Sequence, residues 1–465
     1  MAILTQKDEN EHLLSKSFKS FFTTYRISDI LKKSNIKKEK GISVNTIFFI
    51  LLKTVFLGKS LSRLIRRDEI KIQKDAFYRF INSVHANWDR FISLLSSRVI
   101  EKIVPLTSEK RVNTLILDDT VFKRARSKAV ELLTRVQDHT DMKFYRGFRC
   151  QTLGWSDGNS FVPIGYILLS SAKEKTRING MNEAIDKRTN GYKRRMRAIT
   201  NSYDTAFEML GNARKTKVPA THVLFDSWFS EMKMFRKLRE LKFHGIGMLK
   251  ARKGRQFWWK GRYYNLENLY AIKKNWIPSQ DCMTSIIVNM NVPPKGTNSI
   301  ARKSSQKLRI VFVRNMDRKR DWIAIATTDL SLSDKEVVAL YARRWDIEVF
   351  FKTVKEHLGF ATDFSGRSFD MMCAEIAIVF TRYIMLTITV RNETDLRTGG
   401  DLYFYVYDEL RDFTFAEALL VIFELIDATL KKFVPMSRVK EAKAYFMSHL
   451  PSHFKEIMLL ASCES

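Results

Sequence analysis

The sequence Thr114-Leu-Ile-Leu-Asp-Asp-Thr120 is a short apolar run that ends in polar residues, which is the pattern of a buried β-strand. A second run of this kind, Thr221-His-Val-Leu-Phe-Asp226, is followed by an amphipathic segment from about Ser230 to Lys242. A strand followed by a helix forms an α/β unit. The two runs therefore predict an α/β core that begins near residue 109.

Further strands are expected after the first run. Phe148 to Trp155 and Phe161 to Leu169 have strand composition and are joined by Ser156-Asp-Gly-Asn-Ser160, which has the composition of a hairpin turn. Residues 251–320 are rich in aromatic, Lys and turn residues with strand-type alternation, so we predict a β-rich insertion there. The α/β pattern resumes with Trp322 to Thr328.

Both ends of the chain are expected to be helical, because Gly and Pro are rare near the start and apolar residues recur at helical spacing. Very apolar stretches occur at 371–390 and 415–430. The predicted organisation is a helical region at 1–108, a first core segment at 109–250, the insertion at 251–320, a second core segment at 321–372 and a helical C-terminal region at 373–465.

The chain is strongly basic. Lys and Arg number 80 and Asp and Glu number 50, which gives a formal net charge of +30. An excess of this size predicts a polyanionic partner. In the first region, short helices around 60–67 and 74–83 could form a helix-turn-helix that presents Lys74, Tyr78 and Arg79 to a DNA groove. A plain helical bundle with a solvated basic face is the alternative.

Six basic residues are concentrated between Lys187 and Arg197. A run of this kind is most often a solvated loop, and a loop that contacts a nucleic-acid backbone is the alternative. In the second case Arg194 and Arg195 would contact DNA.

The four Cys residues lie far apart and form no cluster with His, so the sequence indicates neither a zinc site nor a disulfide framework. The apolar stretch 46–57 is interrupted by Lys53 and is shorter than the ~20 residues of a membrane span. Charged residues close to the start argue against a secretory signal. We expect a cytoplasmic protein without a membrane partner.

Several carboxylates occur at positions that are typical of a metal-binding or catalytic site. Asp118 and Asp119 end the first apolar run, Asp226 ends the second, and Glu348 lies in a helix opened by Ser333-Asp-Lys-Glu336, which has the form of a capping box. The carboxyl ends of strands in α/β sheets open onto the ligand crevice, so aspartates there can bind a metal ion. A single Asp at a strand end is more often a turn or cap residue.

The same helix carries Tyr341, Arg344, Glu348 and Lys355. At ~100° per residue these four side chains share one stripe. The stripe suits a catalytic carboxylate flanked by phosphate-binding groups, and it equally suits a surface face with an ion pair between Arg344 and Glu348.

The spacing Tyr341-x2-Arg344-x3-Glu348-x6-Lys355 resembles the YREK signature of the DDE transposases of bacterial insertion sequences, in the insertion sequence four family. The resemblance covers roughly residues 111–390. It implies an α/β fold with an RNase H-like catalytic core that is interrupted by a β-rich insertion. Of the helical regions that flank this core, we expect the first to bind DNA, because it is basic, and the last to pair subunits, because its helices are apolar.

The resemblance implies a catalytic and metal-binding triad of Asp119, Asp226 and Glu348 that holds two Mg²⁺ or Mn²⁺ ions. Oxygen ligands without Cys or His suit these ions. The family places its first Asp before a Thr, which favours Asp119. The alternation of side chains along a strand does not choose between Asp118 and Asp119.

By the same resemblance, Tyr341, Arg344 and Lys355 would hold phosphates of the transposon end. Trp322 would stack on a flipped base, with a core position in its strand as the alternative. The activity implied is cut-and-paste movement of double-stranded DNA through a hairpin intermediate, in a homodimer that pairs two terminal inverted repeats at the bacterial nucleoid. A non-catalytic DNA-binding transposition inhibitor and an RNase H-like structure-specific nuclease are the alternatives.

Overall fold

The computed structural model divides the chain into two compact units, Met1–Leu396 and Arg397–Ser465. The predicted apolar stretch 415–430, like most of the predicted C-terminal region, lies outside the described residues. The structure describes residues 18–38, 40–56, 61–66, 72–108, 111–138, 141–252, 254–274, 283–290, 306–314, 322–364, 366–391 and 438.

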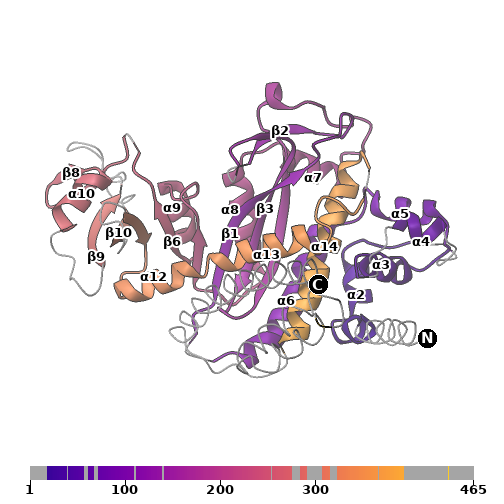
Figure 1. The fold of residues 1–465 in the computed structure, drawn as a ribbon, viewed down its shortest axis with the longest axis horizontal. Coiled ribbons are helices and arrows are strands. Elements are labelled where there is room, and N and C mark those ends of the chain that lie inside the picture. Colours follow the sequence, from indigo (N-terminus) through magenta and orange to yellow (C-terminus); the bar gives the residue numbers. More distant parts are fainter. Residues whose placement is uncertain are drawn as a thin grey trace. The chain divides into compact units, whose positions relative to one another are not determined.

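Five strands form the core of the first unit: β1 (Thr114–Lys123), β3 (Phe144–Ser156), β4 (Phe161–Leu169), β5 (His222–Phe225) and β6 (His244–Leu249). β3 pairs antiparallel with both β1 and β4, whereas β1 pairs parallel with β5, and β5 with β6. The order β4-β3-β1-β5-β6, with antiparallel strands first and parallel strands last, is that of an RNase H-like fold (Figure 1). The predicted fold class is confirmed.

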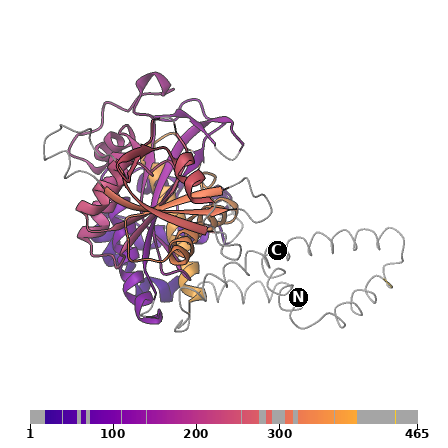
Figure 2. The same cartoon turned by 90° about the vertical axis from the view of Figure 1, so that its left-hand side faces the viewer.

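The segment predicted as a β-rich insertion extends the same sheet. β11 pairs antiparallel with β6, and the strands of the insertion continue outward from it to complete a sheet of 11 strands among the described residues. Figure 2 shows these strands rotated relative to those of the core, as expected for a twisted sheet. The remaining strands are β2 (Thr134–Gln137), β7 (Phe257–Trp259), β8 (Arg262–Tyr264), β9 (Met283–Met290), β10 (Gln306–Arg314) and β11 (Trp322–Thr327).

The predicted hairpin between β3 and β4 is present. Asp157 Oδ1 accepts hydrogen bonds from the backbone N–H groups of Asn159 and Ser160, at 2.9 and 2.7 Å. Gly158 has φ +86°, a left-handed conformation that glycine adopts without strain. The turn thus sets the register of β3 and β4.

Helices cover both faces of the core. The side chains of Gln151 and Ser156 leave β3 on opposite faces. Gln151 bonds to Thr205 in α8, whereas Ser156 Oγ donates to Asp346 in α13 at 2.5 Å. Figure 1 shows α13 crossing one face of the core strands. The helices of the core are α7 (Asn190–Ala198), α8 (Ser202–Lys215), α9 (Met232–Glu240), α12 (Asp334–Ala342), α13 (Trp345–Glu356) and α14 (Phe369–Val390), and α10 (Leu266–Lys273) lies in the insertion.

The predicted helical start of the chain is observed in its described part. An aromatic cluster of Phe48, Phe80, Trp88 and Phe91 holds these helices together. The last of them, α6, packs on β4 and α14, so its apolar face belongs to the same core as the sheet. The helices are α2 (Ile27–Lys33), α3 (Val44–Lys53), α4 (Leu61–Arg66), α5 (Lys74–Ile81) and α6 (Trp88–Ile103); 3-10 turns occur at Val104–Leu106 and Glu174–Thr176.

The basic segment 187–197 differs from its prediction. Its C-terminal part is helix α7 rather than a solvated loop. Arg194 and Arg195 are buried and bind Asp370, at 2.6 and 2.7 Å, and Arg195 also binds Glu131 at 2.6 Å. The expectation that these two residues contact DNA is wrong for this structure, because neither guanidinium has surface left for a phosphate. Their acidic partners lie far away in sequence, so the local pattern did not reveal them.

Helix α14 crosses the centre of the first unit. Residues Phe369–Ile388 are long and apolar enough to span a membrane, but 78% of the window is buried inside the protein, as for a core helix. Arg382 in this helix is fully buried; its guanidinium donates to the carbonyls of Leu51 and Leu358 at 2.5 and 2.8 Å and pairs with Asp363 at 2.8 Å. This side chain ties α3 to the segment that follows α13.

We predict that Arg382→Met lowers the free energy of unfolding by about 3 kcal/mol or more, because it leaves a buried carboxylate and several carbonyls without a partner. Thermal unfolding measures the change. The matched control is Arg126→Met at an exposed position, where we expect less than about 0.5 kcal/mol. Equal losses for both variants would contradict the structural role of Arg382.

Candidate active site

Two of the predicted carboxylates lie on neighbouring strands where their pairing ends. The parallel register of β1 and β5 pairs Leu117 with Phe225 as its last position. Asp226 directly follows β5, whereas Asp118 is the next residue of β1, which continues to Lys123 along β3. The prediction of a strand-end position is therefore correct for Asp226 and wrong for Asp118.

Asp118 and Asp119 lie on opposite faces of β1. Asp119 is paired in register with Gln151, on the α8 face, and its Oδ1 accepts from Arg149 Nη1 at 2.5 Å. Asp118 faces α13, where its Oδ2 lies 3.1 Å from Arg344 Nη1. The structure therefore places Asp118, and not Asp119, on the face that carries Glu348.

The predicted single helix from residue 333 to beyond Lys355 is interrupted. The capping box at Ser333 and Glu336 is present, but α12 ends at Ala342 and α13 begins at Trp345. The backbone N–H groups of Arg343 and Arg344 bond to carbonyls three residues earlier, which is the tighter 3-10 pattern.

The interruption is fixed beside β1, because the Arg343 guanidinium donates to the carbonyl of Val112, just before that strand. Both Arg343 and Arg344 keep right-handed helical dihedral angles. The stripe predicted from helical spacing is therefore preserved, and the expected ion pair between Arg344 and Glu348 forms.

Arg344 is the centre of the site. One guanidinium nitrogen binds Asp118 and the other binds Glu348 Oε1, and Tyr341 shares a hydrogen bond with the same side chain. The Arg344 side chain is 17% exposed. The residues come from β1, α12 and α13. The signature spacing predicted that Tyr341, Arg344 and Glu348 share one face, whereas the contact with Asp118 was not predicted.

Negative charge accumulates around this guanidinium. Burial, together with the charges of Asp119 and Asp226, raises the pKa of Asp118 to about 8, although Arg344 opposes the shift. Burial and Asp119 also raise the pKa of Asp226, while the N–H groups of Phe229 and Trp228 oppose the change. Burial is the largest cause of both shifts, and the neighbouring carboxylates add to it.

Asp226 also has the turn role that was the alternative for a strand-end Asp. Its Oδ1 accepts from the N–H groups of Trp228 and Phe229, at 3.0 and 3.3 Å. Among the described residues, its Oδ2 has no hydrogen-bond partner. The turn therefore fixes the carboxylate and leaves one oxygen available.

The chemistry of the donors fits Mg²⁺ or Mn²⁺, because all are carboxylate oxygens. Their spacing does not, since no group of three acidic, His or Cys side chains in the described part of the chain is arranged to hold a metal ion. Asp118 and Glu348 bind opposite ends of one guanidinium instead.

The remaining predicted residues have different surroundings. Burial raises the pKa of Tyr341 to about 12. Lys355 is exposed on α13, two turns after Glu348. Trp322 is stacked on Tyr270 with ring centroids 4.4 Å apart, as in the alternative that made it a core residue.

Two exposed tryptophans beside the site were missed. Trp228 is 55% exposed and Trp345 is 49% exposed. The backbone of Trp228 is held by Asp226 and by the hydroxyl of Tyr203, which donates to its carbonyl at 2.8 Å. The signal was an aromatic residue directly beside each predicted site residue, in Asp226-Ser-Trp and Arg344-Trp.

Residues 52–262 match a protein-family model described as DDE superfamily endonuclease. The match supports a DDE-type transposase or nuclease. It covers less than half of the chain and includes Asp118, Asp119 and Asp226, but it ends before Glu348. Enzymes of this superfamily act on DNA with divalent metal ions, generally Mg²⁺. No curated protein matches the chain.

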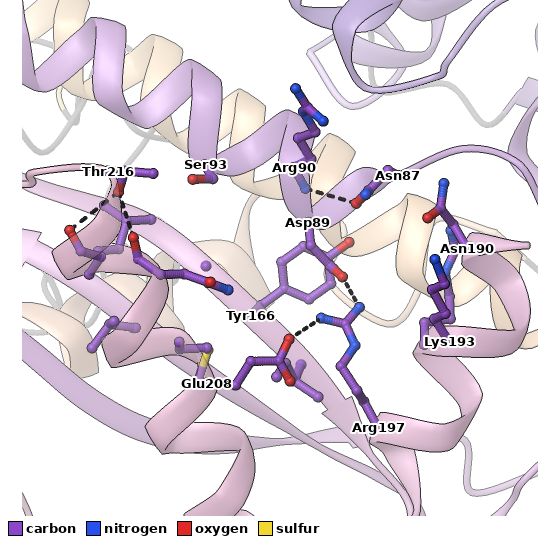
Figure 3. A pocket seen from close by; sticks show the side chains of 18 of the residues that line it. Asn87, Asp89, Arg90, Ser93, Tyr166, Asn190, Lys193, Arg197, Glu208 and Thr216 are labelled. Atoms are coloured by element: carbon purple, nitrogen blue, oxygen red, sulfur yellow. Dashed lines mark hydrogen bonds and ion pairs between the residues drawn. The ribbon is translucent and has the colours of Figure 1, made fainter. Parts of the chain in front are cut away.

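A separate pocket of about 810 Å³ lies among α6, β4, α7 and α8 (Figure 3). Arg197 lies between Asp89 and Glu208 there and binds both, with Nη1 3.0 Å from Glu208 Oε1. None of the predicted catalytic residues lines this pocket. Its acidic groups Asp89 and Glu208 are both paired with Arg197.

The pKa of Asp118 predicts a pH-dependent stability. Between its ordinary pKa of 3.8 and its folded value of about 8, the folded chain binds more protons than the unfolded chain, so this group lowers stability as pH rises. Asp118→Asn should therefore raise Tm, with a gain that grows from pH 5 to 8 and is constant above. Thermal unfolding across this range measures it.

Asp119→Asn is the matched control, because it removes a neighbouring charge that is paired with Arg149. We expect it to leave Tm unchanged or to lower it. A pH-independent effect of Asp118→Asn would contradict the raised pKa of Asp118.

Proposed function

We propose that this protein is a DNA transposase that cuts and joins DNA by metal-assisted hydrolysis of phosphodiesters and transfer of a 3′-OH end. The observation that carries the proposal is that Arg344 binds both Asp118 and Glu348 in an RNase H-like fold, with Asp226 next to Asp118 where the pairing of β1 and β5 ends. The family match and the net charge of +30 support it.

The catalytic carboxylates that we propose are Asp118, Asp226 and Glu348. Asp118 replaces the Asp119 favoured by the family pattern, because Asp119 faces α8 and is held by Arg149. When bound, two divalent cations supply an activated water and stabilise the leaving oxygen. The three carboxylates would hold them from three different elements.

Basic and aromatic side chains beside the carboxylates would hold the DNA. Arg344, Tyr341 and Lys355 donate to phosphates near the cleavage point. The exposed indoles of Trp228 and Trp345 offer stacking faces for bases, worth ~1–3 kcal/mol each.

We propose that the helical region at 1–108 also contacts DNA. Lys74 and Arg79 are exposed on α5, and Lys74 Nζ lies 5.2 Å from the centre of the Tyr78 ring. These residues would enter a groove of the terminal repeat, as a recognition helix does.

The proposal extends to the transposase family and the reaction intermediate. The order and spacing of Tyr341, Arg344, Glu348 and Lys355 favour the insertion sequence four family and its hairpin intermediate. We propose a homodimer that pairs two terminal inverted repeats before it captures target DNA, acting in the cytoplasm at the nucleoid.

Single substitutions test the carboxylates. With DNA that carries the gene and its native flanks, we expect Asp118→Asn and Glu348→Gln to retain binding and to lose cleavage by at least ~100-fold, since the cations lose a ligand. Asp119→Asn is the matched neighbour and should retain most cleavage. Gel assays of binding and cutting measure both. Loss with Asp119→Asn and retention with Asp118→Asn would reverse the assignment.

A structure-specific nuclease remains the second candidate, because the matched family is described as an endonuclease. A transposase joins cut DNA ends to target DNA, whereas a nuclease does not. We expect the chain with Mg²⁺ to transfer a precut end carrying a 3′-OH into a plasmid, as gel electrophoresis would detect. Cutting of uncut ends without any joining of precut ends would favour the nuclease. The intact carboxylates argue against a non-catalytic inhibitor.

A further inference from the structure

The guanidinium of Arg344 occupies the position between two proposed metal ligands. Its Nη1 lies 3.1 Å from Asp118 Oδ2, and its Nη2 pairs with Glu348 Oε1. The Asp118 and Glu348 side chains are 19% and 33% exposed. Both carboxylates are therefore paired with the same cationic side chain of the protein.

This pairing conflicts with metal binding. A divalent cation that is shared by Asp118 and Glu348 would lie next to the guanidinium that now binds one oxygen of each, and two cationic groups in one small site repel each other. It also explains why no three-ligand cluster occurs in the part of the chain that the structure describes. Arg344 must leave before the carboxylates can close on a metal ion.

The local backbone allows Arg344 to move by side-chain rotation alone. Arg344 precedes the first residue of α13, and the neighbouring Arg343 is anchored to the carbonyl of Val112. The backbone of the turn is thereby held, so a change of partners by Arg344 requires only rotation of its long side chain. Tyr341, one turn earlier, shares a hydrogen bond with it and lies on the same stripe.

We infer that Arg344 exchanges partners during the reaction, an inference that rests on the proposed function. Without DNA it neutralises Asp118 and Glu348 and keeps divalent cations out. A phosphate of the DNA end offers the guanidinium two oxygens in the same planar geometry as a carboxylate. When the phosphate takes Arg344, both carboxylates are released to bind metal ions.

The exchange makes DNA and metal binding cooperative. If DNA raises the affinity for the metal ion, the metal ion must raise the affinity for DNA by the same factor. Free protein would therefore hold few cations, and the hydrolytic site would assemble only where a phosphate is in place. Arg344 is in this sense a gate for the metal site as well as a phosphate ligand.

The test measures Mn²⁺ binding to the full chain by electron paramagnetic resonance, without DNA. We expect Arg344→Ala to bind Mn²⁺ at least ~10-fold more tightly than the wild type, within the usual range of such coupling. The added substitution Glu348→Gln should abolish the gain. Thermal unfolding checks that each variant is folded. Equal affinity of wild type and Arg344→Ala would overturn the inference.

Arg149→Ala is the matched control, because it removes the same kind of ion pair from Asp119 on the other face of β1. It should leave the Mn²⁺ affinity unchanged. A gain with Arg149→Ala instead of Arg344→Ala would mean that Asp119 is the ligand, and the inference would fail.

A second arm adds duplex DNA with phosphorothioate linkages, which resist hydrolysis. The wild type should then gain at least ~10-fold in Mn²⁺ affinity, whereas Arg344→Ala should gain little, because its carboxylates are already free. No effect of DNA on the wild type would overturn the exchange.

Failure of the exchange and failure of the proposed function give different results. If cleavage still depends on Asp118 and Glu348 but Arg344 does not affect Mn²⁺ binding, only the exchange is wrong. If cleavage does not depend on these carboxylates, the proposed function is wrong.

Discussion

The parallel pairing of β1 with β5 is the constraint on which the rest of the site depends. It places Asp118 and Asp226 next to each other where the pairing ends, although more than a hundred residues separate them. A parallel pair needs a long crossover connection, and here that connection contains β3, β4, α7 and α8. Of these elements, α8 covers one face of the sheet. The opposite face remains for α13, which brings Arg344 and Glu348 to Asp118.

A second constraint holds α13 at the right depth. Arg343 bonds to Val112, two residues before β1, and Asp346 accepts from Ser156 at the end of β3, so the first turn of the helix is tied to these two core strands. Ile347 and Phe350 are fully buried in the same helix. One face of this helix thus packs in the core and the other carries the polar stripe. Because the two faces differ in polarity, the spacing of the polar residues predicted the stripe from the sequence.

Much of this arrangement could be predicted from local sequence. The limits of β4 agree with the predicted run, the hairpin turn forms, and the capping box opens α12. These features depend on neighbouring residues only. What depends on distant partners could not be predicted: Arg194 is buried because Asp370, 176 residues later, neutralises it, and the interruption at Arg343 exists because Val112 accepts its hydrogen bond.

The choice between Asp118 and Asp119 shows the same limit at the site itself. Strand alternation establishes that the two side chains point apart, but only the register with β3 and the place of α13 decide which face holds Glu348. The face that holds Asp118 and Glu348 also lowers the stability of the fold, since burial together with the charges of Asp119 and Asp226 raises the pKa of Asp118 to about 8. A site with several carboxylates and few cationic side chains can bind metal cations strongly. The guanidinium of Arg344 compensates enough of the negative charge for the chain to fold without these cations. The same side chain that stabilises the fold is then the one that must be displaced for chemistry, so stability and reactivity at this site depend on which anion Arg344 binds.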